Sequence, residues 1–278
     1  MARPPHLQPD PGARRHLRCR HGAHLQPRHR ADLRRPPRLR GRGPHRPPRG
    51  AAHRHHRSGR AGRPARGVRL AVVRLAILVS GRGSNLEAVL RAVEAGRLPG
   101  IAPVLVISNR PAVRALEIAG LHGVPSLVLP ARAFDDLAAR DGAIGRALTD
   151  AGAELALLAG YDQLLRPSYF AAFSGRTINI HASLLPRHGG KGMIGLAVHA
   201  AVLAAGDGET GVTIHDVTAD LDAGPILLQR RVAVRVGESA DQLAERVLKV
   251  EHQALVEVLA HLSASMTDLP RANTRPRR

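Results

Sequence analysis

Residues 74–85 read RLAILVSGRGSN. The first six residues, 74–79, are mostly apolar, and a short glycine-rich run begins at Ser80. After Asn85, apolar side chains recur at the spacing of a helix face, at Leu86, Val89 and Leu90. The stretch therefore predicts a strand, a glycine loop and a helix, in that order.

The same alternation continues along the chain. The expected elements are strand 104–107, helix 112–119, strand 126–129, helix 134–151, strand 155–159, helix 167–173, strands 177–181, 211–217 and 226–234, and a long amphipathic helix at 241–262. Apolar strands that alternate with helices form parallel sheets covered on both faces. We therefore predict an α/β fold, a Rossmann-like and mostly parallel sheet flanked by helices, over residues 71–263.

The formal net charge of +20 is concentrated at the beginning of the chain. Residues 1–67 hold 19 Arg against two acids, Asp10 and Asp32, so the rest of the chain carries only +3. A segment of Arg, His, Pro and Gly buries too little apolar surface to fold. We predict residues 1–70 as a disordered basic tail, and its composition favours a mis-assigned translation start over a nucleic-acid arm or a targeting peptide. Residues 264–278 are expected to be a C-terminal tail.

Several classes of protein are disfavoured by the composition. The single cysteine, Cys19, excludes an internal disulfide and a cysteine-based zinc site. The sequence contains neither an apolar membrane span nor an export signal, so we expect a cytoplasmic protein with no membrane partner. The histidines after the tail show no paired ligand spacing, and no metal is expected.

Three segments with polar side chains follow predicted strands, where ligands bind in open parallel sheets. Residues 80–85 offer backbone N–H groups and a helix N-terminus to a phosphate, although such a loop also forms plain strand-to-helix turns. In residues 177–187, Asn179 and His181 share one strand face, and pair an amide donor for an oxyanion with a proton carrier. Residues 220–225 bring Asp222 into a turn, where aspartate is also common for structural reasons.

Together these segments resemble a known family. SGRGSN, NIHASLLP, GETGVTIH and LDAGPILLQ, within about residues 73–262, are similar to the phosphoribosylglycinamide formyltransferases. The motif pair NIHxSLLP and LDxGPI is specific to the folate-dependent formyltransferases. The motif SGRGSN is similar to that of the branch which acts on a small phosphorylated substrate. GGKGMIGLAVH at 189–199 resembles a subgroup with a GKGMYG loop.

The resemblance implies transfer of a formyl group from 10-formyltetrahydrofolate, as co-substrate, to the amine of 5'-phosphoribosylglycinamide in purine synthesis. The residues it assigns are Asn179, His181 and Asp222 to catalysis, Gly83, Ser84 and Asn85 to the phosphate, Glu251 to the ribose hydroxyls, and Asp162, Gln163, Leu164, Leu165 and Asn179 to the folate. In the implied mechanism, Asn179 and protonated His181 stabilise the oxyanion, and a nearby Asp222 carboxylate favours the imidazolium. Three positions depart from the family pattern: Ala182, Ile194 and Leu137.

The alternatives belong to the same fold or to another class. Methionyl-tRNA formyltransferase shares the HASLLPR motif but needs a further C-terminal domain, and only about sixteen residues follow the last predicted helix. Formyltetrahydrofolate deformylase needs a folded upstream domain. An RNA-binding protein would carry its charge on a folded face with aromatic residues, whereas this basic tail contains none, so we expect small-molecule partners and no specific nucleic acid.

Overall fold

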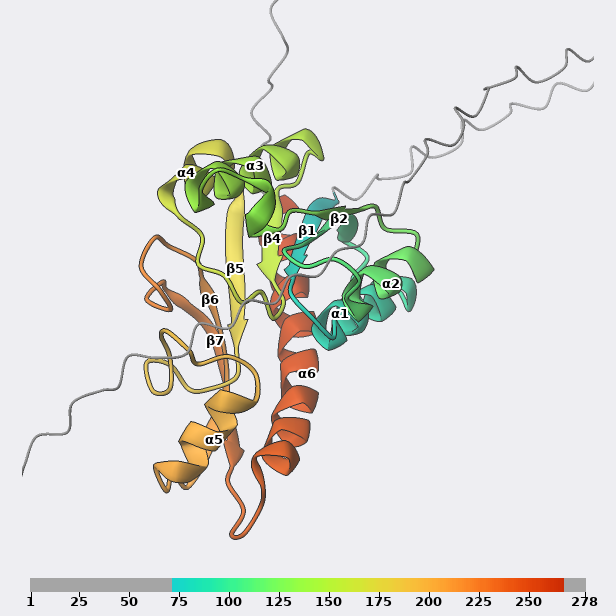
Figure 1. Cartoon of the computed structure of the whole chain (residues 1–278). Helices are drawn as coiled ribbons and strands as arrows, with labels where there is room; N and C mark the ends of the chain where they lie inside the picture. The colour runs from blue at the N-terminus through green and yellow to red at the C-terminus, as the bar shows by residue number, and fades with distance from the viewer. Residues whose placement is uncertain (1–71, 268–278) are drawn as a thin grey trace, which may run out of the picture. The chain divides into compact units, whose positions relative to one another are not determined.

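The computed structural model describes residues 72–267, which belong to the unit Pro64–Arg278. Figure 1 shows a central sheet with helices packed against it. Its strands are β1 (Val73–Val79), β2 (Ile101–Ser108), β3 (Ser126–Val128), β4 (Leu155–Leu158), β5 (Arg176–His181), β6 (Glu209–Asp216) and β7 (Ile226–Ala233). The predicted disordered tail at residues 1–70 lies outside the described residues.

The seven strands lie in the order β3-β2-β1-β4-β5-β6-β7. The pairs from β3 through to β5 are parallel, whereas β5–β6 and β6–β7 are antiparallel. The predicted mostly parallel α/β fold is therefore confirmed. The strand order changes direction between β1 and β4. After β1 the chain continues to a helix on one face of the sheet, and after β4 to a helix on the other face. Between the carboxyl ends of these strands lies the crevice in which such folds bind ligands.

Helices cover both faces because the side chains of β1 alternate between two cores. Val73, Leu75, Ile77 and Val79 join the core with α1 (Ser84–Glu94), α2 (Arg114–Leu121) and α6 (Ala240–Thr267). Ala76 and Leu78 point the other way, to α3 (Leu137–Asp150) and α4 (Pro167–Ala172). A strand buried on both faces reads as a continuous apolar run, which explains the sequence of β1.

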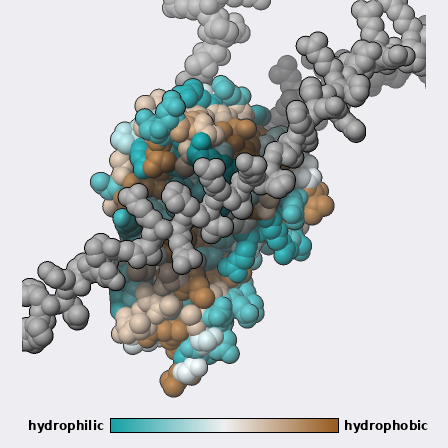
Figure 2. Space-filling model, in the orientation of Figure 1, coloured by the Kyte–Doolittle hydropathy of each residue, from teal (hydrophilic) through white to brown (hydrophobic). Residues whose placement is uncertain are grey.

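Two helical segments differ from the prediction. A helix α5 (Leu196–Ala204) and a short 3-10 turn (Ala131–Ala133) were not expected. The α5 sequence LAVHAAVLA is apolar on every side and has no helical periodicity to recognise. Apolar side chains gather over the α5 region in Figure 2, where Leu196 is 46% exposed.

The last helix, α6, continues to Thr267, past the predicted start of the C-terminal tail at residue 264. The hydroxyls of Ser263 and Ser265 donate to the carbonyls of Ala260 and Leu262, so these polar residues stay within the helix. Ser263 is buried against Gly100, where a β-carbon would lie 2.9 Å from its hydroxyl. Residues 268–278 lie outside the described residues.

Candidate active site

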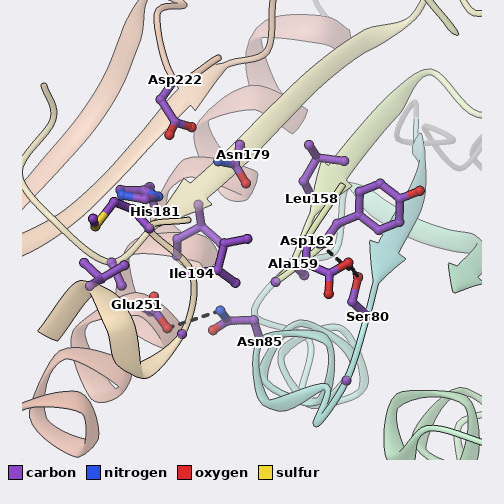
Figure 3. A pocket seen from close by; sticks show the side chains of 18 of the residues that line it. Ser80, Asn85, Leu158, Ala159, Asp162, Asn179, His181, Ile194, Asp222 and Glu251 are labelled. Carbon is purple, nitrogen blue, oxygen red and sulfur yellow. Dashed lines mark hydrogen bonds between the residues drawn. The ribbon is translucent and has the colours of Figure 1, made fainter. Parts of the chain in front are cut away.

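A cavity of about 740 Å³ opens at the carboxyl ends of β1, β4 and β5. Figure 3 shows side chains from these strands, from the loop after β6 and from α6 around it. Every predicted site residue lines this one cavity: Gly83, Ser84, Asn85, Asp162, Gln163, Leu164, Leu165, Asn179, His181, Asp222 and Glu251. Of the three departures, Ala182 and Ile194 line the cavity and Leu137 does not.

One end of the cavity is the turn between β1 and α1. Gly83 has a left-handed backbone with φ 76°, and a β-carbon there would lie 2.8 Å from both Cα and Cβ of Ala115. Only glycine fits this position without strain. The helix begins at Ser84, so the N–H groups of its first turn lack helical acceptors and the positive end of its dipole faces the cavity. This geometry suits an anion such as a phosphate.

Beside this turn, α6 contributes a buried acid. The Asn85 amide donates to Glu251 Oε2 at 3.2 Å, and Figure 3 shows the pair at the cavity wall. Burial raises the pKa of Glu251, against the opposing effects of the Asn85 hydrogen bond and the Arg82 charge. The other amide atom, Asn85 Oδ1, is buried with no partner within residues 72–267. Because the Asn85 side chain is directed to Glu251, its backbone N–H is the group that remains for an anion.

At the other end, β5 and β6 bring the side chains of Asn179 and His215 together. Asn179 lies opposite His215 in the antiparallel register, and Asn179 Nδ2 is 3.1 Å from His215 Nε2. His215 Nδ1 lies 2.8 Å from the carbonyl of Asp216, which can only accept a hydrogen bond. Nδ1 therefore donates to this carbonyl, and Nε2 is the ring atom that faces the Asn179 amide. The Asn179–His215 bond orients the Asn179 amide and leaves its second N–H for a ligand.

The predicted proton carrier, His181, is held by a backbone carbonyl. Its Nε2 lies 2.8 Å from the oxygen of His188, so Nε2 donates and Nδ1 is the atom left to accept a proton. His188 has a left-handed backbone with φ 52°, and its own ring is hydrogen-bonded to Asp207 Oδ2 at 2.7 Å. This bond, with the neighbouring Arg187 charge, holds the pKa of Asp207 below its usual range despite an opposing effect of burial.

Asp222 reaches the same region from the turn between β6 and β7. Its Oδ2 accepts from the Gly190 N–H at 2.8 Å, and its Oδ1 is 3.7 Å from His215 Nε2. The structure thus joins Asp222 to His215 and to the loop after β5, and not directly to His181. The expected stabilisation of the His181 imidazolium by Asp222 stays a prediction.

The segment after β4 forms a third wall. Asp162 accepts hydrogen bonds from Ser80, Asn109 and Gln163 and pairs with Arg110, which links the ends of β1, β2 and β4. Burial alone would raise the pKa of Asp162, but these hydrogen bonds and the Arg110 charge lower it. The Asp162 backbone is bonded as well, because its N–H donates to Ser80 Oγ at 2.9 Å and its carbonyl accepts from Gln163 at 3.1 Å.

Among the cavity residues that were not predicted as site residues are two histidines, His215 and His199. His215 stands in the quoted GETGVTIH segment, whose alternation places it on the Asn179 side of the sheet. His199 lies on the unpredicted helix α5, is 5% exposed, and its Nδ1 has no partner within the described part of the chain. Burial, and secondarily the His181 charge, lower the pKa of His199, which favours its neutral form.

Within residues 72–267, no group of three or more His, Cys, Asp or Glu side chains is arranged to hold a metal ion. None of the helices in this range has the length and apolar character required to cross a bilayer.

Comparison with known proteins matches residues 73–259 to the formyl transferase family. Phosphoribosylglycinamide formyltransferase from Escherichia coli (strain K12) is 36% identical over 178 residues, which are 64% of this chain and 81% of that protein. Trifunctional purine biosynthetic protein adenosine-3 from Bos taurus is 38% identical over 187 residues, which are 67% of this chain. This chain spans only 18% of the length of the bovine protein.

A solved structure is similar over the same part of the chain. The crystal structure of glycinamide ribonucleotide transformylase 1 from Symbiobacterium toebii is 36% identical in sequence, with a TM-score of 0.66. The similarity covers 70% of this chain and 89% of that one. Sequence and fold thus point to the same group of relatives.

Proposed function

The chain belongs to the formyl transferase family, and we propose that it transfers the formyl group of 10-formyltetrahydrofolate to the amine of 5'-phosphoribosylglycinamide in purine synthesis. The names of its relatives support this substrate pair. The observation that carries the proposal is one cavity with two chemically different ends. An anion site formed by Gly83–Asn85 lies at one end, and Asn179, His181 and Asp222 lie at the other. A small substrate with a phosphate and a reacting amine matches that arrangement.

The anion end binds and orients the phosphorylated substrate. The phosphate accepts hydrogen bonds from the backbone N–H groups of Gly83, Ser84 and Asn85, assisted by the helix dipole. The ribose hydroxyls bond to Glu251 and to Asn85 Oδ1, which has no other partner within residues 72–267. With these groups fixed, the substrate amine is directed towards β5, so that attack becomes an intramolecular-like step.

At the catalytic end, the amine attacks the formyl carbon and negative charge develops on the formyl oxygen. The free N–H of Asn179 and the protonated ring of His181 stabilise this oxyanion. The new C–N bond forms as the bond from carbon to the folate N10 breaks. The proton lost by the amine is delivered to N10, through His181 or through water held by Asp222, so charge and atoms balance.

The folate occupies the wall after β4. Residues 162–165 present backbone groups to the pterin ring, and Leu164 at 45% exposed offers an apolar surface beside it. Neither reactant requires a resident metal in this mechanism. We further propose that the protein acts in the cytoplasm on small molecules, without a specific nucleic-acid or membrane partner, and the single cysteine agrees with a reducing compartment.

The decisive experiment compares three reactions of the purified full chain with 10-formyltetrahydrofolate. We expect formyl transfer to 5'-phosphoribosylglycinamide, with neither transfer to methionyl initiator tRNA nor rapid release of formate in the absence of an acceptor. Transfer to the tRNA, or hydrolysis alone, would instead identify methionyl-tRNA formyltransferase or deformylase activity.

A further inference from the structure

A buried ion pair lies behind the wall that forms after β4, outside the cavity itself. Arg140 and Asp141 are consecutive residues of α3, and both side chains are 0% exposed. Arg140 donates twice to Asp141 Oδ1, from Nε at 2.9 Å and from one terminal nitrogen at 2.6 Å. Neither residue belongs to the cavity lining. The proposed reaction therefore makes no direct use of them.

The remaining hydrogen-bonding groups of the pair reach the segment 162–166. The second terminal nitrogen of Arg140 donates to Gln163 Oε1 at 3.1 Å. Asp141 Oδ2 accepts from the backbone N–H of Arg166 at 3.0 Å and from its guanidinium at 3.2 Å. Gln163 in turn donates to the backbone carbonyl of Asp162 at 3.1 Å. The pair thus holds the segment at two residues, Gln163 through its side chain and Arg166 through its backbone amide and its guanidinium.

At its start the segment is also held by Asp162, which bonds to Ser80, Asn109 and Arg110, whereas Gln163 and Arg166 bond to the pair. Residues 161–166 form neither helix nor strand, so no ladder of backbone hydrogen bonds determines their path. The pair reaches them because α3 lies very close to α4. A β-carbon on Gly145 would be 2.7 Å from the Tyr169 carbonyl and 2.8 Å from Ala172 Cβ. Glycine at this contact brings α3 and its charges within hydrogen-bonding distance of the loop.

Burying two charges is costly, and apolar residues of similar size often give equal or greater stability. What an apolar pair cannot do is bond to a side-chain amide and a backbone N–H in one defined geometry. The planar guanidinium provides donors in fixed directions, so it bonds to Asp141 and Gln163 at once, whereas a lysine ammonium on a flexible stem does not. The geometry favours a positioning role over a stabilising one.

We propose that the Arg140–Asp141 pair positions residues 162–166 and thereby sets the affinity of the cavity for its folate co-substrate. Arg140 and Asp141 are positioning residues that act through Gln163 and the Arg166 amide. The assignment of the ligand rests on the proposed function. The claim about the segment rests on the hydrogen bonds alone.

The test is Arg140→Lys, which keeps the charge and removes the fork. We expect the KM for 10-formyltetrahydrofolate to rise about tenfold, the effect of one lost hydrogen bond to a charged group. The KM for 5'-phosphoribosylglycinamide should change less than about twofold, because the anion end is untouched. Amide hydrogen exchange of residues 162–166 should become faster, while exchange in β1 and α1 stays unchanged.

A control and further variants make the result decisive. Arg230→Lys alters an exposed pair with Glu257 and should change neither KM nor exchange in residues 162–166. If Arg140→Lys does not fold, the double variant Arg140→Met with Asp141→Leu removes both charges and should show the same rise in folate KM. Gln163→Leu should also raise the folate KM. Combining it with Arg140→Lys should raise the KM little further, because both substitutions remove the same Arg140–Gln163 hydrogen bond.

The outcomes separate the two claims. Unchanged exchange in residues 162–166, or an equal rise of both KM values, would overturn the positioning role. If the wild type transfers no formyl group to 5'-phosphoribosylglycinamide, the proposed function fails, and the exchange comparison still decides whether the pair positions the segment. In that case binding of tetrahydrofolate, measured by calorimetry, replaces KM as the test of the ligand.

Discussion

The two ends of the cavity are built in different ways. The anion end comes almost entirely from six consecutive residues, 80–85, whose strand, glycine turn and helix N-terminus follow from local sequence. The catalytic end joins β5, β6, the loop after β5 and the turn that bears Asp222. Two residues there, His188 and Asp222, have left-handed backbones without being glycine.

This difference indicates that one end of the cavity serves binding and the other serves catalysis. The anion end offers fixed N–H groups that bond equally to substrate and transition state, so damage there should weaken binding. The catalytic end holds the groups that act on developing charge, and damage there should slow turnover.

At the catalytic end, we predict that His181→Ala lowers kcat by about two to four orders of magnitude, because the proton carrier and an oxyanion donor are lost. The KM for 5'-phosphoribosylglycinamide should remain near that of the wild type. Steady-state kinetics with both substrates varied provides the measurement, and His261→Ala on α6 is the control. A variant that keeps a tenth of wild-type kcat would remove His181 from the mechanism.

At the anion end, Gly83→Val should have the opposite signature. The new β-carbon meets Ala115 at 2.8 Å and the backbone is left-handed, so the turn must shift. We expect the KM for 5'-phosphoribosylglycinamide to rise about tenfold or more, the loss of at least one charged hydrogen bond, with a much smaller change in kcat. Gly120→Ala, in open space on α2, is the matched control. A fall in kcat without a change in KM would contradict the division.

The pH dependence of stability sharpens the comparison further. Because burial raises the pKa of Glu251, the folded protein holds this proton more tightly than the unfolded chain does. Its contribution to stability is therefore complete below the ordinary pKa of 4.5 and is lost as the pH rises through the raised value.

Glu251→Gln has no such titration and keeps an acceptor for Asn85. We predict that its Tm, relative to the wild type, increases from pH 5 to pH 8 by about 2–4 °C. Thermal unfolding of the ligand-free proteins at several pH values measures this difference. Glu257→Gln, at an exposed pair, should show no such trend. A difference in Tm that stays constant across the pH range would mean that burial does not raise the pKa of Glu251.

The smallest effect is expected from removing residues 1–67. All proposed site residues and all seven strands of the sheet lie within residues 72–267. We predict unchanged kcat and Tm, together with loss of the salt-sensitive nucleic-acid binding that the +17 charge of this segment should confer. Activity assays, thermal unfolding and binding at two salt concentrations compare the two proteins. Loss of activity on truncation would show that the segment supports the site.

Much of the fold was predictable because its strands and helices follow from patterns between residues that are close in the sequence. The strands at β1, β2 and β4 are apolar runs, and β5 alternates apolar with polar side chains; the structure confirms all four. Gly83 could be singled out because a strand-to-helix turn requires its backbone conformation. The candidates Asn179, His181 and Asp222 follow predicted strands, and the resemblance groups them as catalytic. The structure places them around one cavity, while their roles remain proposals.

The sequence by itself determined the order of the elements, the α/β class and the glycine turn, because periodicity and backbone preference act between near neighbours. Only the tertiary structure decided the partners: Glu251 for Asn85, His215 for Asn179, His188 for His181, and the Arg140–Asp141 pair for residues 162–166. These contacts join residues whose side-chain directions depend on how strands and helices pack. The helix α5 belongs with them, because its uniformly apolar sequence becomes a helix only against its neighbours.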